Sequence, residues 1–387
     1  MAQKKILIVA GEASSDLHSA SLIEAIKALD PQIKFFGLGG ERMRQAGADL
    51  YYDIVELAVV GLFEVIKNLK KFKEIFDNTL EKIDQMHPDL AILVDYPGFN
   101  LRLAEQLKIR QIPIIYYISP QIWAWGRKRT KVIKKLVDKM LVFFKFEEEL
   151  YKKEGIPVSF IGHPLLDTTR PNLDKEMLFK KLRSHPSRYT ISLLPGSRLR
   201  EVKTHLPIML DAAQWIYKEL KDVQFLILRA STVKEEVFHE ILSRYRLPVY
   251  VLSDMTYDGL ASSDFAIVAS GTATLETAIL GIPMAIIYKV SFLSWLYLRM
   301  AIKIPHIGIV NIVAGEMVVP EFIQYNARPK KIADYVIKTL TDTKESDRIK
   351  QFLGKVKTML GEPKATQRAA RMILECLNEP RPSYKIS

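Results

Sequence analysis

Short apolar runs alternate with longer periodic segments along most of this 387-residue chain. In the first half the runs are KKILIVA, IKFFGLG, DLAILVDY, IPIIYYIS, DKMLVFF and VSFIG. In the second half they are YTISLLPG, VQFLILRA, LPVYVLS, SDFAIVAS and IPMAIIYK. Strands that are apolar on both faces and separated by helix-length segments are typical of parallel sheets in open α/β folds.

Eleven such strands exceed the usual size of a single sheet, so we expect two doubly wound domains. The boundary is expected in the polar stretch 164–187, which contains three prolines. This divides the chain into an N-terminal domain over residues 1–167, a second domain over 168–341 and a helical tail over 342–387, broken at 361–363.

Ligands of open parallel sheets bind at the carboxyl ends of the strands, which directs attention to the loops that follow the predicted strands. The loop SGTATLE opens a helix after the strand DFAIVAS. Its residues Ser270, Gly271 and Thr272 would present backbone N–H groups to an anion, and Glu276 could accept hydrogen bonds from ribose hydroxyls. The alternative is a capping arrangement, with Thr272 as the N-cap and no ligand.

A second loop of this kind, LPGSRLRE, follows the strand ISLL. Gly196 and Ser197 form a turn of the size of a phosphate, and Arg198 offers a fixed fork of donors. The alternative is an ordinary strand-to-helix loop in which the arginine pairs with Glu201. The P-loop pattern G-x-x-x-x-G-K-[ST] is absent.

In the first half, Asp95 stands at the end of the apolar strand DLAILV, which makes it a candidate general base. The alternative is an Asx-turn that starts the sequence Asp-Tyr-Pro-Gly. Glu12, Asp16 and His18 follow the first strand, in a loop that should face the cleft. Helix capping by Ser14, Ser15 or Asp16 explains part of that loop.

The net charge of +12 favours an anionic partner, which could be a nucleic acid, an acidic lipid surface or a phosphorylated substrate. Segments 61–76, 126–139 and 289–303 mix apolar and basic residues and favour an acidic interface or an amphiphile, although each could be an ordinary surface helix. No apolar run reaches the length of about 20 residues that spans a bilayer. Any contact with a membrane would therefore be made from the cytosolic side without crossing.

Metal and disulfide chemistry find little support in the composition. The single cysteine, Cys376, cannot form an internal disulfide, which indicates a reducing compartment. Neither an Asp-x-Asp pair nor a cluster of cysteine and histidine occurs, so a metal-dependent mechanism has no visible ligands.

The order of the motifs resembles the lipid A disaccharide synthase family from residue 5 to about residue 340. The motifs are GEASSDLHSASLIEAIKAL, GLGGERMRQAG, VVGLFEV, DYPGFNLRLA, SPQIWAWGRKR, FIGHPLLD, LLPGSRLREV, ASGTATLETAILGIPM and IVNIVAGEMVVPEFIQ. Two departures are Val310, where the family usually has proline before Asn311, and Ser15, where glycine is expected.

The resemblance implies an α/β fold of two Rossmann-like domains of the GT-B type facing a central cleft. It also implies an inverting transfer of 2,3-diacylglucosamine from UDP to 2,3-diacylglucosamine 1-phosphate (lipid X), without a metal or other cofactor. The products would be a β-1,6 disaccharide 1-phosphate and UDP. Asp95 would deprotonate the acceptor 6-hydroxyl, and Arg198 would neutralise the charge that builds on departing UDP.

The resemblance further assigns two sets of binding residues. The donor set is Gly196, Ser197, Arg198, Gly271, Thr272, Ala273, Thr274, Glu276, Asn311 and Gln324. The acceptor set is Glu12, Ser14, Asp16, His18, Phe99, Asn100, Trp123 and His163, with acyl chains received around residues 57–63 and Trp123.

The same resemblance implies peripheral association with the anionic inner membrane of Gram-negative bacteria, on the cytoplasmic face. It also implies a homodimer, in which the C-terminal tail could be exchanged. Two alternatives remain open at this point. One is another sugar-nucleotide enzyme of the same fold, such as a different glycosyltransferase or a UDP-sugar epimerase. The other is a nucleic-acid-binding module, for which no RNA- or DNA-binding motif is found.

Overall fold

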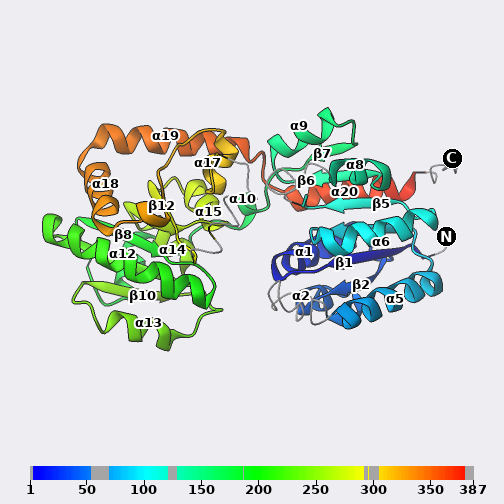
Figure 1. Ribbon diagram of the computed structural model, residues 1–387, viewed down its shortest axis with the longest axis horizontal. Coiled ribbons are helices and arrows are strands. Elements are labelled where there is room, and N and C mark those ends of the chain that lie inside the picture. Colours follow the sequence, from blue (N-terminus) through cyan, green and yellow to red (C-terminus); the bar gives the residue numbers. More distant parts are fainter. Residues whose placement is uncertain are drawn as a thin grey trace. The chain divides into compact units, whose positions relative to one another are not determined.

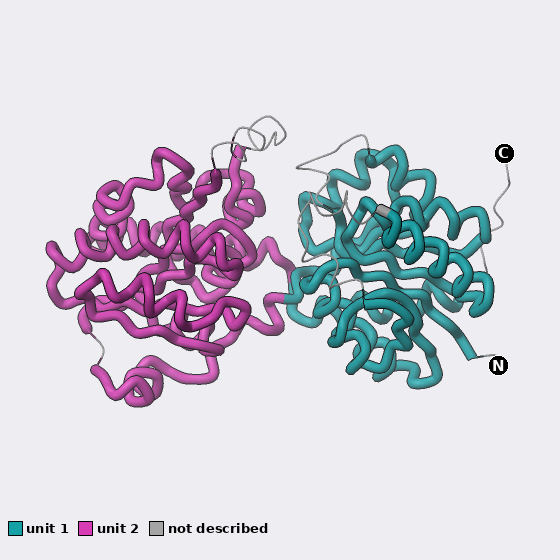
Figure 2. The backbone as a smooth tube through the Cα atoms, turned by 60° about the horizontal axis from the view of Figure 1, so that its bottom comes forward, with its two compact units in different colours: residues 1–164, 362–387 teal, residues 165–361 magenta. Residues whose placement is uncertain are grey.

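The computed structural model describes residues 3–53, 69–120, 129–185, 187–291, 295 and 305–379. The chain divides into two compact units, shown in Figure 2. Unit 1 comprises residues 1–164 and 362–387, and unit 2 comprises residues 165–361. Each unit has its own parallel sheet with helices, which confirms the predicted two-domain α/β fold.

The sheet of unit 1 has seven parallel strands in the order β3-β2-β1-β4-β5-β6-β7. The strands are β1 (Lys5–Ala10), β2 (Lys34–Gly39), β3 (Asp49–Asp53), β4 (Leu90–Val94), β5 (Ile114–Tyr117), β6 (Lys139–Val142) and β7 (Val158–Phe160). The direction of winding reverses between β1 and β4, as in doubly wound nucleotide-binding folds.

Helices cover both faces of this sheet (Figure 1). They are α1 (Ala13–Leu29), α2 (Glu41–Gln45), α5 (Leu69–Met86), α6 (Pro97–Ile109), α8 (Arg129–Leu136), α9 (Lys145–Lys153) and α20 (Ala365–Asn378). Alternate residues of β1 enter different cores: Ile6 and Ile8 pack with α1 and α20, and Leu7 and Val9 pack with α6 and α8. Burial on both faces is the reason that the strands are continuous apolar runs.

Unit 2 repeats this architecture with six parallel strands in the order β10-β9-β8-β11-β12-β13. The strands are β8 (Tyr189–Leu194), β9 (Val223–Arg229), β10 (Val249–Ser253), β11 (Phe265–Ala269), β12 (Met284–Tyr288) and β13 (Glu321–Ile323). The helices are α10 (Leu165–Thr168), α11 (Lys175–Lys181), α12 (Leu199–Leu220), α13 (Glu235–Leu242), α14 (Thr256–Ala261), α15 (Ala273–Ile279), α17 (Ile309–Ala314), α18 (Pro329–Thr341) and α19 (Thr343–Met359). Here the winding reverses between β8 and β11.

The segment expected as a separate tail is divided between the units. The helix α19 belongs to unit 2, and α20 returns to unit 1, where it packs against α1 (Figure 1). The guanidinium of Arg368 in α20 donates to the backbone oxygen of Ile161 from Nε at 2.9 Å and from Nη2 at 2.7 Å. It also donates to the oxygen of Pro363 at 2.6 Å. One side chain therefore joins the two places where the chain leaves and re-enters unit 1. Exchange of the tail in a dimer stays a prediction.

Candidate functional site

A cavity of about 670 Å³ opens in unit 2 at the carboxyl ends of β8 and β11, the two neighbouring strands between which the winding reverses. Ligands bind at this position in open α/β sheets. Asn172, between α10 and α11, lines the cavity. The other lining residues lie at the ends of β8, β9, β10 and β11 or in the segments that follow them: Leu194, Gly196, Ser197, Arg198, Glu201, Leu228, Ala230, Asp254, Met255, Thr256, Tyr257, Asp258, Ala269, Ser270, Gly271, Thr272, Ala273 and Glu276.

The loop after β8 is closed by a helix cap. Oε2 of Glu201 accepts from the backbone N–H of Ser197 at 3.1 Å and of Arg198 at 3.2 Å. Gly196 has φ 114°, and a Cβ there would lie 2.5 Å from the same carboxylate oxygen, so this position requires glycine. The N–H groups expected to meet a phosphate are therefore occupied by Glu201.

The side chain of Arg198 is nevertheless accessible on the cavity wall. Its Nη1 lies 3.7 Å from Oε1 of Glu201, which is the pairing that the alternative interpretation of this loop expected. The arginine side chain is 82% exposed, so this ion pair is weak and leaves the guanidinium able to bind an anion.

The loop after β11 brings small residues to the cavity. Gly271, Thr272 and Ala273 line it, and a Cβ added to Gly271 would meet no atom within 4 Å. The hydroxyl of Thr274 is buried and donates to the backbone oxygen of Gly271 at 2.8 Å, so it stabilises the turn. Thr272 stands at the N-cap of α15, as the capping alternative expected, but its side chain makes no capping hydrogen bond.

Glu276 lies one turn into α15 and reaches the same cavity. Its Oε1 accepts a hydrogen bond of 2.9 Å from the hydroxyl of Tyr257, which stands on α14. Burial raises the pKa of the Glu276 carboxyl, and the bond from Tyr257 opposes this effect. The carboxylate thus faces the cavity with a neutral donor as its partner.

Three predicted donor residues do not line this cavity: Thr274, which lies behind the turn, Asn311 and Gln324. Asn311 is fully buried: its Nδ2 donates to the oxygen of Val319 and to Oε1 of Glu321, and its Oδ1 accepts from the N–H groups of Val318 and Val319. Its amide therefore supports the chain around β13. Gln324 donates to the oxygen of Val290 at 3.3 Å and lines a different cavity of unit 2.

In unit 1, Asp95 follows β4 at the point where the winding reverses. Asp95 and Tyr96 have φ 46° and 45°, a left-handed backbone that costs energy in residues other than glycine. The side chain of Asn100 stabilises this turn by donating to the oxygens of Val94 at 3.1 Å and Asp95 at 2.8 Å. Burial, with a smaller contribution from Glu12, raises the pKa of Asp95 to about 6.

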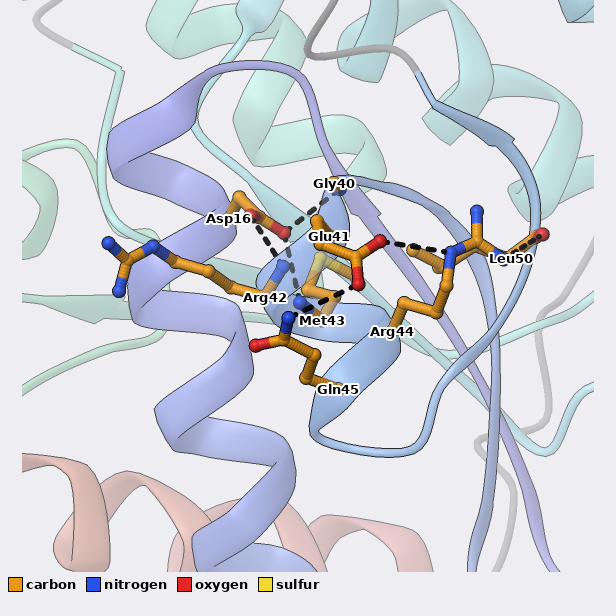
Figure 3. Close-up of polar contacts among 8 residues, drawn as sticks. All are labelled: Asp16, Gly40, Glu41, Arg42, Met43, Arg44, Gln45 and Leu50. Atoms are coloured by element: carbon orange, nitrogen blue, oxygen red, sulfur yellow. Dashed lines mark hydrogen bonds and ion pairs between the residues drawn. The ribbon is translucent and has the colours of Figure 1, made fainter. Parts of the chain in front are cut away.

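Asp16 belongs to the fold rather than to an open surface (Figure 3). Its carboxylate, on α1, accepts from the backbone N–H groups of Gly40 at 2.9 Å, Arg42 at 3.2 Å and Met43 at 3.1 Å. These groups form the start of α2, which has no capping side chain of its own. The expected capping by Asp16 is present, on a different helix from its own.

The remaining acceptor candidates differ in exposure. Glu12 and Ser14 are exposed, whereas Phe99 lies in the core against Phe76 and Tyr96. Burial lowers the pKa of His18 to about 4 and, together with the nearby His18, that of His163 to about 3. The lowered pKa values keep both imidazoles neutral near pH 7. Each ring packs against Phe143, with the two ring centroids 5.3 Å apart. Trp123 and residues 57–63 lie outside the described residues.

Sequence reasoning missed two residues of unit 2. Tyr257 follows β10, so the rule that ligands bind at the carboxyl ends of parallel strands could have found it. Nε2 of His205 accepts from the N–H of Lys289 at 3.1 Å, and its Nδ1 forms a hydrogen bond of 3.0 Å with the oxygen of Pro195. These bonds stabilise the loop after β8. The position of His205 inside a helix gave no signal in the sequence.

A family model described as lipid-A-disaccharide synthetase matches residues 6–375. The lipid-A-disaccharide synthase of Syntrophus aciditrophicus is 44% identical over 380 residues, which cover 98% of this chain and 99% of that one. That of Geobacter sulfurreducens is 42% identical, with 97% and 98% covered. The chain belongs to the lipid-A-disaccharide synthase family. It is therefore a glycosyltransferase of lipid A biosynthesis, as the motifs predicted.

Solved structures of other proteins confirm the two-domain α/β fold of this member of the lipid-A-disaccharide synthase family. A putative UDP-N-acetylglucosamine 2-epimerase from Listeria monocytogenes superposes with a TM-score of 0.66 at 15% identity, over 100% of both chains. MurG of Acinetobacter baumannii gives a TM-score of 0.57 at 12% identity, over 96% of this chain and 99% of that one. The two sheets thus form the GT-B architecture shared by glycosyltransferases and sugar-nucleotide epimerases.

The described residues bear on membrane insertion and on metal binding. In this part of the chain no helix combines the length and the apolar character needed to cross a bilayer. The same residues include no group of three or more histidine, cysteine, aspartate or glutamate side chains arranged to hold a metal ion.

Proposed function

We propose that this glycosyltransferase transfers 2,3-diacylglucosamine from UDP to 2,3-diacylglucosamine 1-phosphate with inversion at the anomeric carbon. The 6-hydroxyl oxygen of the acceptor forms a bond to that carbon as the bond to the UDP oxygen breaks. The hydroxyl proton passes to a base, and the electron pair leaves with UDP. The products are the β-1,6 disaccharide 1-phosphate and UDP.

The observation that carries this proposal is the cavity of unit 2, with Arg198, Gly271 and Glu276 on its wall, in a member of this family. Its volume of about 670 Å³ is typical of sites for small molecules and cofactors. The small residues 271–273 allow a diphosphate to approach, and Arg198 supplies positive charge. The carboxylate of Glu276 suits the two hydroxyls of a ribose.

In this proposal Arg198 stabilises the charge that develops on the leaving UDP, which is why no metal is required. Arg198→Ala should therefore lower kcat, and Glu276→Gln should mainly raise the KM for the donor. Arg200→Ala is a matched control, because Arg200 is an exposed arginine of the same segment that does not line the cavity. Equal losses for Arg200→Ala and Arg198→Ala would contradict the role of Arg198.

Asp95 is the proposed base in unit 1. A pKa of about 6 leaves its carboxyl mostly ionised at neutral pH and makes it a stronger base than an ordinary aspartate. Asp95→Asn should lower turnover by about 10²–10⁴-fold and leave UDP binding unchanged. Asp84→Asn, on the exposed surface of α5, is the control. Near-normal turnover by a folded Asp95→Asn variant would exclude Asp95 as the base.

The cofactor and partner proposals have direct tests. We expect EDTA to leave activity intact, and inhibition that a divalent ion reverses would contradict a metal-free mechanism. We also propose peripheral, salt-sensitive binding to the cytoplasmic face of the inner membrane, to which the charge of +12 contributes. Equal flotation with neutral and anionic vesicles would refute this binding mode. Mixing differently tagged chains tests the homodimer with exchanged tails.

The epimerase alternative retains one argument, the likeness of the fold to UDP-N-acetylglucosamine 2-epimerases. Release of UDP separates the two activities. A glycosyltransferase releases UDP when an acylated acceptor is present, whereas an epimerase converts one UDP-sugar into its epimer with the nucleotide still attached. Conversion of the donor into an epimeric UDP-sugar, with no release of UDP when the acceptor is added, would favour the epimerase.

A further inference from the structure

Tyr257 links two of the loops that form the cavity of unit 2. It stands at the start of α14, after β10, and its hydroxyl donates to Oε1 of Glu276, on α15, at 2.9 Å. Both side chains line the cavity. In the part of the chain that the structure describes, no other side chain donates a hydrogen bond to the carboxylate of Glu276.

The backbone that carries Tyr257 is held firmly. The buried carboxylate of Asp258 accepts from the N–H groups of Asn172 at 2.5 Å and Leu173 at 2.8 Å. The next residue, Gly259, packs so closely against Leu228 that a Cβ would lie 2.4 Å from a methyl carbon of that leucine. Its backbone oxygen accepts from the hydroxyl of Ser263 at 2.8 Å. These contacts fix α14 and therefore the direction of the phenol.

The hydrogen bond also determines what Glu276 can offer to a ligand. A carboxylate has about four acceptor positions on its two oxygens. The phenol occupies one position on Oε1, which leaves Oε2 to accept from a second donor. Glu276 is largely buried and has a neutral partner. Loss of this hydrogen bond would therefore leave the carboxylate free to rotate, and less of the cost of burying its charge would be offset.

We propose that Tyr257 is a positioning residue for nucleotide recognition, which orients Glu276 so that its carboxylate receives the ribose hydroxyls. This inference rests on the proposed function, which assigns the cavity to a UDP-sugar. Tyr257 acts through Glu276 and not on the reacting atoms, so it governs donor affinity rather than the chemical step.

The test measures binding of UDP and of 2′,3′-dideoxy-UDP to the full chain by titration calorimetry. We expect Tyr257→Phe to weaken UDP binding by about 10- to 150-fold, the effect of one hydrogen bond to a charged group. Binding of the dideoxy nucleotide should not change, because it lacks the hydroxyls. In a Glu276→Ala background, which offers the phenol no acceptor, the same substitution should have no further effect on UDP binding. In turnover assays the KM for the donor should rise while kcat stays within about twofold.

Tyr245→Phe is the matched control. The hydroxyl of Tyr245 donates to Oδ1 of Asp211, also at 2.9 Å and also in unit 2, but neither residue lines the cavity. This variant removes a bond of the same kind and should bind both nucleotides as the unaltered protein does.

Three results would overturn the inference and leave the proposed function standing. They are unchanged UDP binding by Tyr257→Phe, equal weakening for UDP and the dideoxy nucleotide, or full weakening that persists in the Glu276→Ala background. Failure of the unaltered protein to bind UDP would overturn the proposed function and this inference together.

Discussion

Replacement of Asp16 by alanine separates a structural role from a role in acceptor binding. The carboxylate satisfies three backbone N–H groups at the start of α2, and Asp16 itself is only 5% exposed. Alanine removes the acceptor and leaves no room for water to reach these groups freely. The variant should therefore lose stability in unit 1 while the folded molecules keep their catalytic groups.

The size of the effect follows from the number and kind of bonds. An N-cap is worth about 0.5–2 kcal/mol, and a hydrogen bond to a charged group about 1.5–3 kcal/mol. Three donors share one carboxylate, so their contributions do not add fully, and we expect a loss of about 3 kcal/mol for Asp16→Ala. Asp16→Asn keeps one acceptor oxygen and should lose about 1 kcal/mol. For a domain of this size, about 3 kcal/mol lowers the melting temperature by roughly 6–12 °C.

Thermal unfolding followed by circular dichroism measures this shift, and hydrogen exchange of a peptide over residues 34–53 localises it to α2. Asp174→Ala is the control, because Asp174 caps α11 of unit 2 through a single exposed bond of 2.8 Å to the N–H of Met177. It should leave exchange in residues 34–53 unchanged. If Asp16→Ala melts within about 2 °C of the unaltered protein but loses turnover more than 100-fold, Asp16 serves the acceptor and our reasoning is wrong.

Three further predictions concern pH and packing. Because Asp95 has a pKa of about 6 and must be ionised to act as a base, kcat/KM should fall about tenfold per pH unit below pH 6, and a flat profile from pH 5 to 8 would contradict this. The pKa values of His18 and His163 in the folded state lie below the ordinary 6.5, so their contribution to the free energy of unfolding is present above pH 6.5 and is lost as the pH falls toward 4. A melting temperature of unit 1 that is constant from pH 7 to 4 would refute this prediction. Ile373→Ala in α20 should cost unit 1 about 2–5 kcal/mol, measured by denaturant titration with Ile373→Val as the milder control, and unchanged stability would contradict the packing.

The strands show what a hydrophobic pattern can and cannot predict. All eleven predicted strands are present, because burial of both faces produces runs that are apolar throughout. The two strands that the pattern missed, β3 with the sequence DLYYD and β13 with EFI, lie at sheet edges and are partly exposed. An edge strand needs no continuous apolar run, and its sequence resembles that of a loop.

The site residues show the same limit for polar groups. The rule that ligands bind at strand ends led to the loops that line the cavity, and the ion pair of Arg198 and Glu201 is the alternative to a phosphate site that the sequence left open. The sequence could not show that the amide of Asn311 and the carboxylate of Asp16 are occupied by backbone groups. The partners of Asn311 stand 7–10 residues away along the chain and those of Asp16 stand 24–27 residues away, so only the fold brings them together.

The return of α20 to unit 1 has a consequence for how the chain is made. Because α1 and α20 pack against each other, the core that contains Ile23 and Ile373 cannot be completed until the last helix leaves the ribosome. All of unit 2 is synthesised before that moment, and domains generally fold as units while synthesis proceeds. The cavity of unit 2 can therefore form before α20 has completed unit 1. A chain that stalls after α19 would carry an intact second unit and an N-terminal unit with an uncovered apolar face.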